Sequence, residues 1–499
     1  RYRYTTMTSA EAKSADNEEK GSTDWWTITI GALISLFTAG QVTLYLSSLW
    51  PYLRVLLDDD ASSTVYSVII ASSPFCSAIS SPLFGFWANR MNNTKLPAEA
   101  GIMLMLAGHV IYLLLPFQLA HPYFIMLTAR SINGIGSGVI SVLWANSVAG
   151  SAVKDRSRAL SMNCGAFTIG LTCGPAFQLA FTYLSYPGIR IAGDFTLNIY
   201  NGPAVAGVFI NLLSIILLNA GYKDSKANAY AVEEDVKEDH RRFYALPKFD
   251  RAPAALIIYT RFVQTFMFTN LESIGTIYMM NMFNWGKEMA VFWLSFMYMA
   301  TWMLEFCVHA LNTIFNFGAT WNHRLWCIIG QMLLMLFHLL TFPWWGLPGQ
   351  LVIEPDGVQG PNGTEITGCS RDYDWCKTST PVSPVLFIAS HVGCISVALA
   401  LTSITSMTLY SVIIGPRNQG TMQGFILLAA HISRLSGLVV VPLFVTYGPR
   451  PIWLVFIAVL ASCIIGWILL YRRLVPLKLP SERAPGDVFF TKFGKVYKF

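Results

Sequence analysis

The stretch that decides the fold is PYFIMLTARSINGIGSGVISVLWANSVAG, which covers residues 122–150. It contains one charged residue, Arg130, and it is long enough to cross the roughly 30 Å hydrocarbon core of a bilayer as a helix. Gly134, Gly136 and Gly138 lie in its middle, where small residues let neighbouring helices approach closely. An arginine in hydrocarbon is costly and usually faces a bundle interior or an aqueous cavity. The stretch therefore predicts a transmembrane helix that packs inside a bundle and turns Arg130 inward.

The composition of the whole 499-residue chain is that of a membrane protein. Apolar residues make up 54% of it, whereas Asp, Glu, Lys and Arg make up 12%, about half the share in a typical soluble protein. So few charges cannot cover a soluble globule, and so much apolar content excludes a disordered or collagenous chain. Because no basic run interleaved with aromatic residues is present, no nucleic-acid partner is expected. We predict an all-α polytopic membrane protein.

Twelve apolar stretches are long enough to span a bilayer. Lysine and arginine concentrate in the cytosolic segments of membrane proteins. With both termini in the cytosol, the cytosolic segments hold 25 of these residues and the opposite side holds six, so we predict cytosolic termini. The predicted spans lie near residues 26–50, 64–88, 99–118, 122–150, 158–184, 202–220, 253–281, 289–316, 322–343, 384–413, 421–445 and 451–472.

Charged segments divide the chain into domains. Residues 221–252 predict a cytosolic linker between an N-terminal six-helix bundle (25–220) and a C-terminal six-helix bundle (253–472). Residues 1–24 and 473–499 are expected to be cytosolic tails, and residues 1–24 lack the apolar core of a signal peptide.

The loop at residues 344–383 is predicted to face the lumen or the cell exterior. It contains the glycosylation acceptor pattern at Asn362, which is modified only on that side of a membrane. It also contains Cys369 and Cys376, the two cysteines that lie outside the spans. In an oxidising compartment these two cysteines are expected to form a disulfide.

Six plus six spans joined by a charged linker resemble the layout of the major facilitator superfamily. Arg130 followed by spaced glycines is similar to the span-4 signature of that family. After the second span, Gly85, Asn89 and Arg90 resemble the family's Gly and Asp-Arg loop signature, with Asn89 in place of the acid. The resemblance implies a major facilitator fold of two six-helix bundles, with this loop gating the two halves.

The fifth span adds to this resemblance. Gly170, Gly174 and Pro175 are similar to the family's glycine-rich span that ends in Gly-Pro. The resemblance implies that these residues, like the glycines of the fourth span, pack helices closely together.

Further segments resemble the lysosomal branch of the superfamily associated with late-infantile neuronal ceroid lipofuscinosis. This closer resemblance implies a divergent relative in late endosomes or lysosomes that conducts chloride. Because residues 1–24 contain no acidic dileucine signal, the plasma membrane is the alternative location. The segments are SLWPYL (48–53), SPLFG (81–85), LNIY (197–200), GCS (368–370), WC (375–376), SMTLYS (406–411) and YGPR (447–450).

Five charged residues lie well inside the predicted spans, away from their ends: Arg130, Arg261, Glu272, Glu305 and Arg434. One interpretation is that two of the arginines, 130 and 434, attract an anion, while the two glutamates tune the site or exchange protons. The other interpretation is structural ion pairs that hold the helices in register. Arg261, near the start of its span, is expected to extend to the cytosolic surface.

His309 lies four residues after Glu305, so the two side chains share a helix face. A histidine beside a carboxylate is suited to binding a proton in an acidic compartment.

Three functions remain open at the level of sequence. The first is an endolysosomal pathway for a small anion such as chloride. The second is proton-coupled transport of a small organic solute, with Glu272 or the Glu305–His309 pair as the proton site. The third is a membrane receptor or scaffold that transports nothing. No cofactor, metal or enzymatic activity is expected, since the chain shows no P-loop, nucleophile elbow or zinc motif, and a monomer is expected in the bilayer.

Overall fold

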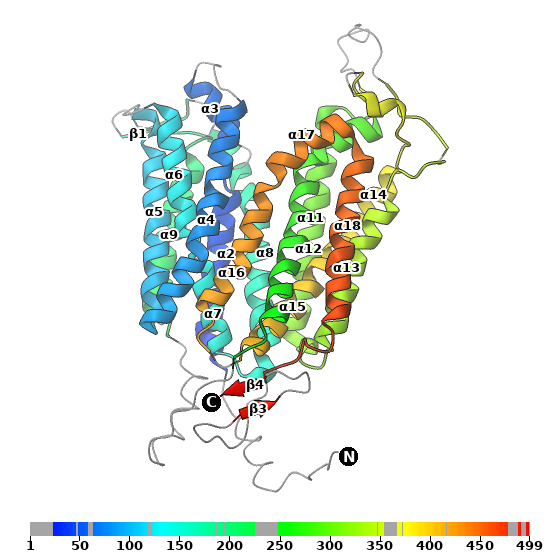
Figure 1. Ribbon diagram of the computed structural model, residues 1–499. Coiled ribbons are helices and arrows are strands. Elements are labelled where there is room, and N and C mark those ends of the chain that lie inside the picture. Colours follow the sequence, from blue (N-terminus) through cyan, green and yellow to red (C-terminus); the bar gives the residue numbers. More distant parts are fainter. Residues whose placement is uncertain are drawn as a thin grey trace, which may run out of the picture.

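The computed structural model describes residues 23–45, 48–57, 63–117, 121–184, 187–192, 195–224, 248–346, 348–353, 367–371, 373–415, 417–477, 488–490 and 496–498. Within these ranges long helices form two bundles that stand next to each other (Figure 1). We call α2 to α9 the N-terminal half and α11 to α18 the C-terminal half. Most of the tail 1–24, most of the linker 221–252 and the sequon at Asn362 lie outside the described residues.

The N-terminal half begins at α2, which is capped by Asp24. The Asp24 carboxylate accepts a hydrogen bond from the Thr27 amide over 3.1 Å and so satisfies a free N–H of the first turn. The helices of this half are α2 (Trp25–Thr43), α3 (Leu49–Leu56), α4 (Ser63–Met91), α5 (Lys95–Leu113), α6 (Pro122–Gly136), α7 (Val139–Ala149), α8 (Arg156–Ala180) and α9 (Gly202–Gly221).

The C-terminal half begins at α11, which is capped in the same way by Asp250. Asp250 accepts from the Ala252 amide and also pairs with Arg473 over 2.7 Å, which ties the start of α11 to the segment after α18. The helices of this half are α11 (Arg251–Phe283), α12 (Lys287–Phe315), α13 (His323–Leu340), α14 (Pro384–Ser390), the π-helix η6 (His391–Ile395), α15 (Ser396–Ile414), α16 (Gly420–Leu435), α17 (Gly437–Tyr447) and α18 (Pro449–Leu469).

Short elements connect the long helices. Two antiparallel hairpins pair β1 (Ile189–Ala192) with β2 (Phe195–Leu197) and β3 (Val488–Phe490) with β4 (Val496–Lys498). The described residues also contain five 3₁₀ turns: η1 (Leu115–Phe117), η2 (Val153–Asp155), η3 (Phe181–Leu184), η4 (Phe317–Ala319) and η5 (Asp374–Lys377).

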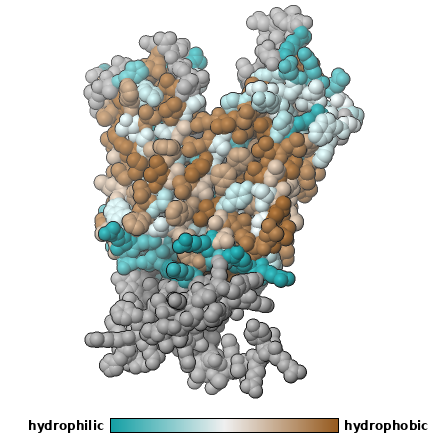
Figure 2. Space-filling model, viewed as in Figure 1, coloured by the Kyte–Doolittle hydropathy of each residue, from teal (hydrophilic) through white to brown (hydrophobic). Residues whose placement is uncertain are grey.

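Ten helical segments of the described residues are long and apolar enough to cross a membrane. Two further helices, α8 with 25 residues and α11 with 33, are more polar than these ten and pack among them. Together they make up the twelve predicted spans. Apolar residues cover the face of the helical region seen in Figure 2, with a hydrophilic band at its lower edge. The prediction of an all-α membrane protein with twelve spans is confirmed, and the two short hairpins are additions to it.

Several predicted spans are interrupted. The stretch 122–150 breaks into α6 and α7 at Ser137 and Gly138, and the stretch 421–445 breaks into α16 and α17 at Ser436. The stretch 384–413 contains the π turn η6. Interrupted helices and π turns in membrane proteins are frequent where a helix contributes to a functional site. The break in α16–α17 comes two residues after Arg434, which makes this region a candidate site.

The two halves meet at the end of the molecule where α2 begins and α18 ends, which we call the terminal end. Gly85 of α4 lies so close to Gly420 of α16 that an added Cβ would collide with the Gly420 carbonyl. Asn312 of α12 donates hydrogen bonds to Ser157 Oγ and Ser161 Oγ of α8 over 3.2 and 2.6 Å. At the opposite end, which we call the loop end, a cleft separates the two halves (Figure 2). The molecule is therefore closed at the terminal end and open at the loop end.

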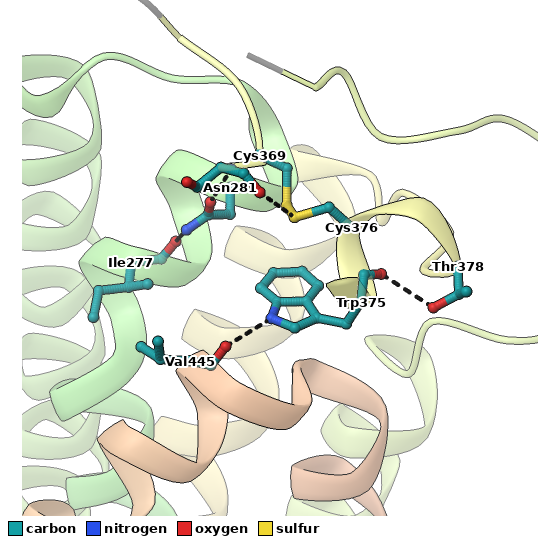
Figure 3. The surroundings of a disulfide bond; sticks show 8 residues. Ile277, Asn281, Cys369, Trp375, Cys376, Thr378 and Val445 are labelled. Carbon is teal, nitrogen blue, oxygen red and sulfur yellow. Dashed lines mark hydrogen bonds between the residues drawn. A yellow bond between two sulfur atoms is a disulfide. The ribbon is translucent and has the colours of Figure 1, made fainter. Parts of the chain in front are cut away.

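The loop that contains Cys369 and Cys376 is fastened to the C-terminal half. The two cysteines form a disulfide, as predicted (Figure 3). The Ser370 amide donates to Asn281 Oδ1 of α11, and Trp375 Nε1 donates to the Val445 carbonyl of α17 over 3.0 Å (Figure 3). The loop thus joins the loop ends of α11 and α17.

Candidate substrate site

Arg130 lies in α6 and is 5% exposed, so it is buried in the N-terminal half as the sequence predicted. Its guanidinium carbon lies 5.6 Å from the centre of the Tyr45 ring, a cation–π contact of the kind that contributes about 0.5 to 2 kcal/mol. Tyr66 and Tyr112 also interact with it electrostatically. Among the described residues, no carboxylate pairs with Arg130 and its Nε–H has no hydrogen-bond partner. Arg130 is therefore a buried cation whose charge is not neutralised.

A small pocket opens beside this guanidinium. Its volume of about 10 Å³ is close to the lower limit for one water molecule. Five of its eight lining residues carry a hydroxyl or amide group. The lining residues are Thr38, Gln41, Val42, Ser73, Met105, Arg130, Asn133 and Ser137.

Arg434 and Glu272 form a second charged group, in the C-terminal half. Glu272 lies on α11 and Arg434 near the end of α16, and the two interact electrostatically. Close by, Asn270 Nδ2 donates to Ser436 Oγ over 2.9 Å and so holds α11 against the break after α16. The sequence left two interpretations of Arg434 open: a residue that attracts an anion together with Arg130, or a member of a structural ion pair. In the structure Arg434 interacts electrostatically with Glu272, as the second interpretation expects.

The expectation that Arg261 extends to the cytosolic surface is wrong. Its Nη1 donates to Gln264 Oε1 over 3.0 Å and to Ser403 Oγ of α15 over 3.4 Å. It also interacts electrostatically with Glu305 of α12 and Cys164 of α8. Arg261 therefore points into the molecule, toward the contact between the two halves, and belongs to the charged group of the C-terminal half.

Glu305 and His309 share one face of α12, as the spacing predicted. His309 Nε2 lies 3.8 Å from Glu305 Oε1, and the two residues are 1% and 9% exposed. Neither ring nitrogen of His309 has a hydrogen-bond partner among the described residues. Its Cβ packs against Gly165 of α8, so the pair lies where the C-terminal half touches the N-terminal half.

The loop signature after the second span lies at the terminal end. Asn89 accepts a hydrogen bond from the Gly420 amide over 2.9 Å and donates to Thr421 Oγ1 and to the Asn418 carbonyl. An asparagine thus binds the first turn of α16 across the two halves, where the family signature has an acid. The neighbouring Arg90 is exposed.

The glycines of the fourth and fifth spans lie at close helix contacts. An added Cβ on Gly134 would collide with Ser73 of α4, one on Gly136 with Gly101 and Met105 of α5, and one on Gly138 with Ser80. In α8, Gly170 and Gly174 face α2 in the same way, against Leu36 and Thr43. Pro175 lies in α8, and its side chain lies outside the described atoms.

Sequence reasoning missed four residues that surround Arg130. Tyr45, Tyr66 and Tyr112 come from three different helical regions, and His109 of α5 contacts Tyr45. Tyrosine and histidine are common in membrane helices, and no spacing along the chain connects these positions. These four residues could have been predicted only by knowing which faces of α2, α4 and α5 pack against α6.

The fold and the site together define a membrane transporter: two bundles of spanning helices, closed at one end, with charged residues buried in each half. The family model described as the Major Facilitator Superfamily matches residues 30–354, more than half of the chain. The chain belongs to the major facilitator superfamily.

Among its relatives is the Xenopus laevis protein named major facilitator superfamily domain-containing protein 8. That protein is 26% identical over 482 residues, which cover 92% of this chain and 93% of the relative. The chain is thus a divergent relative of it.

Two solved structures have the same fold. The human organic anion transporter MFSD10 (TETRAN) matches with a TM-score of 0.61 at 13% identity, over 88% of this chain and 98% of that one. FucP in its outward conformation matches with a TM-score of 0.57 at 14% identity, over 90% of this chain and 99% of that one.

Proposed function

We propose that this protein moves a small anion such as chloride across the membrane of late endosomes or lysosomes. The observation that carries the proposal is Arg130, a buried arginine that lines a small pocket and has no carboxylate beside it in the described residues. An arginine at the centre of a membrane helix costs roughly 2.5 to 3.5 kcal/mol on insertion scales. An anion bound beside Arg130 offsets part of that cost, so the free energy of the site favours an anion over a cation.

The charges of the C-terminal half support the same assignment. There two arginines, Arg261 and Arg434, interact electrostatically with Glu305 and Glu272, so the group is balanced. Only the N-terminal half carries an intramembrane cation without a described counter-charge. We therefore place the anion site at Arg130 and assign the C-terminal group to coupling and to helix contacts.

The shape of the molecule fits alternating access, in which the two halves open in turn to each side of the membrane. We infer that the terminal end faces the cytosol, because 25 lysines and arginines lie on that side against six on the other. The described state then opens toward the lumen.

The endolysosomal location rests on the resemblance of the segments 48–53, 368–370, 375–376 and 447–450 to the lysosomal branch of the superfamily. Imaging of the tagged protein against a lysosomal marker tests the location. A signal confined to the plasma membrane would contradict it.

Patch-clamp recording of enlarged endolysosomes tests the anion function. Arg130→Ala should reduce the chloride current at least tenfold, because it removes the only described cation of the pocket, and Arg130→Lys should retain part of it. Arg472→Ala, which removes an exposed arginine just after α18, is the matched control and should leave the current unchanged. Equal currents in the Arg130→Ala variant and the unmodified protein would refute the assignment.

A second candidate function is proton-coupled transport of a small organic solute. The observation that favours it is the buried His309–Glu305 pair at the contact between the halves. Uptake of a solute that rises with an imposed proton gradient, and loses that dependence in Glu305→Gln, would support it over an uncoupled anion pathway.

A further inference from the structure

Buried polar side chains from α9, α2 and α5 form a hydrogen-bonded line that ends at Tyr45, whose ring contacts Arg130. Asn211 Nδ2 of α9 donates to Gln41 Oε1 of α2 over 2.8 Å. The same oxygen lies 2.7 Å from His109 Nε2 of α5, and His109 Nδ1 is hydrogen-bonded to the Tyr45 hydroxyl. Each of these side chains is 5% exposed or less, so water does not compete for the hydrogen bonds.

Two backbone carbonyls determine which atom donates and which accepts in each hydrogen bond of this line. A carbonyl oxygen only accepts, and Asn211 Nδ2 lies 2.9 Å from the Gly207 oxygen, while Gln41 Nε2 lies 3.1 Å from the Phe37 oxygen. Both amides are therefore oriented with their nitrogens toward the backbone of their own helices. The Gln41 oxygen is left to face His109.

The tautomer of His109 follows from that orientation. Because Gln41 Oε1 has no proton, His109 Nε2 must carry the hydrogen. In the neutral ring Nδ1 is then the acceptor, and the Tyr45 hydroxyl donates to it. The Tyr45 hydroxyl therefore donates its hydrogen to His109 and does not donate to an anion in the pocket.

The line also fixes the ring of Tyr45 against Arg130. The hydroxyl is held by His109, and the ring centre lies 5.6 Å from the guanidinium carbon. A ring face attracts a cation through its quadrupole but carries no net charge, whereas a carboxylate at the same place would cancel the charge of Arg130. An added Cβ on Gly207 would collide with the His109 ring, so this glycine lets α9 approach the line.

We propose that Tyr45, held in place by Asn211, Gln41 and His109, is a positioning residue that keeps Arg130 in the pocket and leaves its positive charge available to the anion. This inference rests on the proposed anion function. It assigns the positioning of Arg130 to four uncharged residues, which leave the charge of the guanidinium in place, whereas a carboxylate there would cancel it.

The test measures chloride flux by the full-length protein in liposomes as a function of chloride concentration. Tyr45→Leu removes the ring and should raise the half-saturating chloride concentration roughly 2- to 30-fold, the range that corresponds to one cation–π contact. Tyr45→Phe keeps the ring and should raise it less. Tyr52→Leu is the control, because it removes another buried tyrosine of the same aromatic cluster, one that stacks on Tyr200.

A second measurement needs no variant and is insensitive to a general packing defect. Nitrogen NMR of labelled His109 in the unmodified protein should show a protonated Nε2 and an unprotonated Nδ1. A proton on Nδ1 would overturn the proposed line even if the Tyr45 variants failed to fold.

The flux outcomes separate this inference from the proposed function. If Arg130→Ala abolishes chloride flux but Tyr45→Leu behaves like the unmodified protein, or no worse than Tyr52→Leu, the positioning role is wrong and the anion function stands. If Arg130→Ala leaves the flux unchanged, the anion function itself is wrong.

Discussion

At the scale of single residues, the buried charges of this protein differ in their partners. Arg434 has an acid nearby and Arg130 has tyrosines, although both are arginines inside a span. The sequence predicted that both lie inside the bundle, because an arginine in hydrocarbon must avoid lipid. It could not predict their partners, because those come from helices far away in the chain. Arg261 lies in α11, which is apolar on several sides. The sequence pattern therefore did not determine the rotation of α11 about its axis, nor the direction in which the Arg261 side chain points.

Asn89 gives a prediction at this scale. Asn89→Ala removes three hydrogen bonds between the halves, which are worth about 0.5 to 1.5 kcal/mol each. We expect the population of molecules closed at the terminal end to fall at least about fivefold relative to the open form. Distances between spin labels at Met91 and Thr320, two exposed positions at the terminal ends of the two halves, report this ratio.

The control for this experiment is Asn93→Ala. Asn93 accepts a hydrogen bond from the Leu96 amide within the N-terminal half, so its loss should leave the distance distribution unchanged. A shift as large in Asn93→Ala as in Asn89→Ala would contradict the role of Asn89 as a contact between the halves.

At the scale of elements, the sequence predicted where helices are but not where they break. A run of about 20 apolar residues is set by bilayer thickness, so α9 (Gly202–Gly221) coincides with the predicted stretch 202–220. The breaks at Ser137–Gly138 and at Ser436 depend on contacts with neighbouring helices. Ser137, for example, bonds to Ser77 of α4 over 2.6 Å, a contact that links positions 60 residues apart in the chain.

The disulfide loop gives a prediction at this scale. Replacing Cys369 and Cys376 by serine opens a short closed loop, which the chain-entropy estimate values at about 2 to 3 kcal/mol. The amides of Cys369 and Thr378, which are hydrogen-bonded within this region, should then exchange with deuterium roughly 30- to 150-fold faster. Amides in the middle of α4 serve as the internal reference, and unchanged exchange at Thr378 would show that Trp375 alone holds the loop.

At the scale of the whole molecule, the two halves share a fold and differ in charge. The C-terminal half balances its buried charges, whereas the N-terminal half keeps one positive charge beside a small pocket. The division into two bundles was predictable from the linker and the spacing of spans. That Arg130 is the one charge well inside the N-terminal spans can also be read from the sequence. Its uncharged surroundings were not predictable, because the members of the line from Asn211 to Tyr45 come from three spans and have no pattern in common.

The measurement that tests the central claim most directly is chloride efflux from liposomes that contain only the purified protein. The account predicts efflux that exceeds that of protein-free liposomes, that saturates with chloride, and that falls at least tenfold in Arg130→Ala but not in Arg472→Ala. Efflux of equal size in the Arg130→Ala variant, or transport of cations in place of chloride, would contradict it.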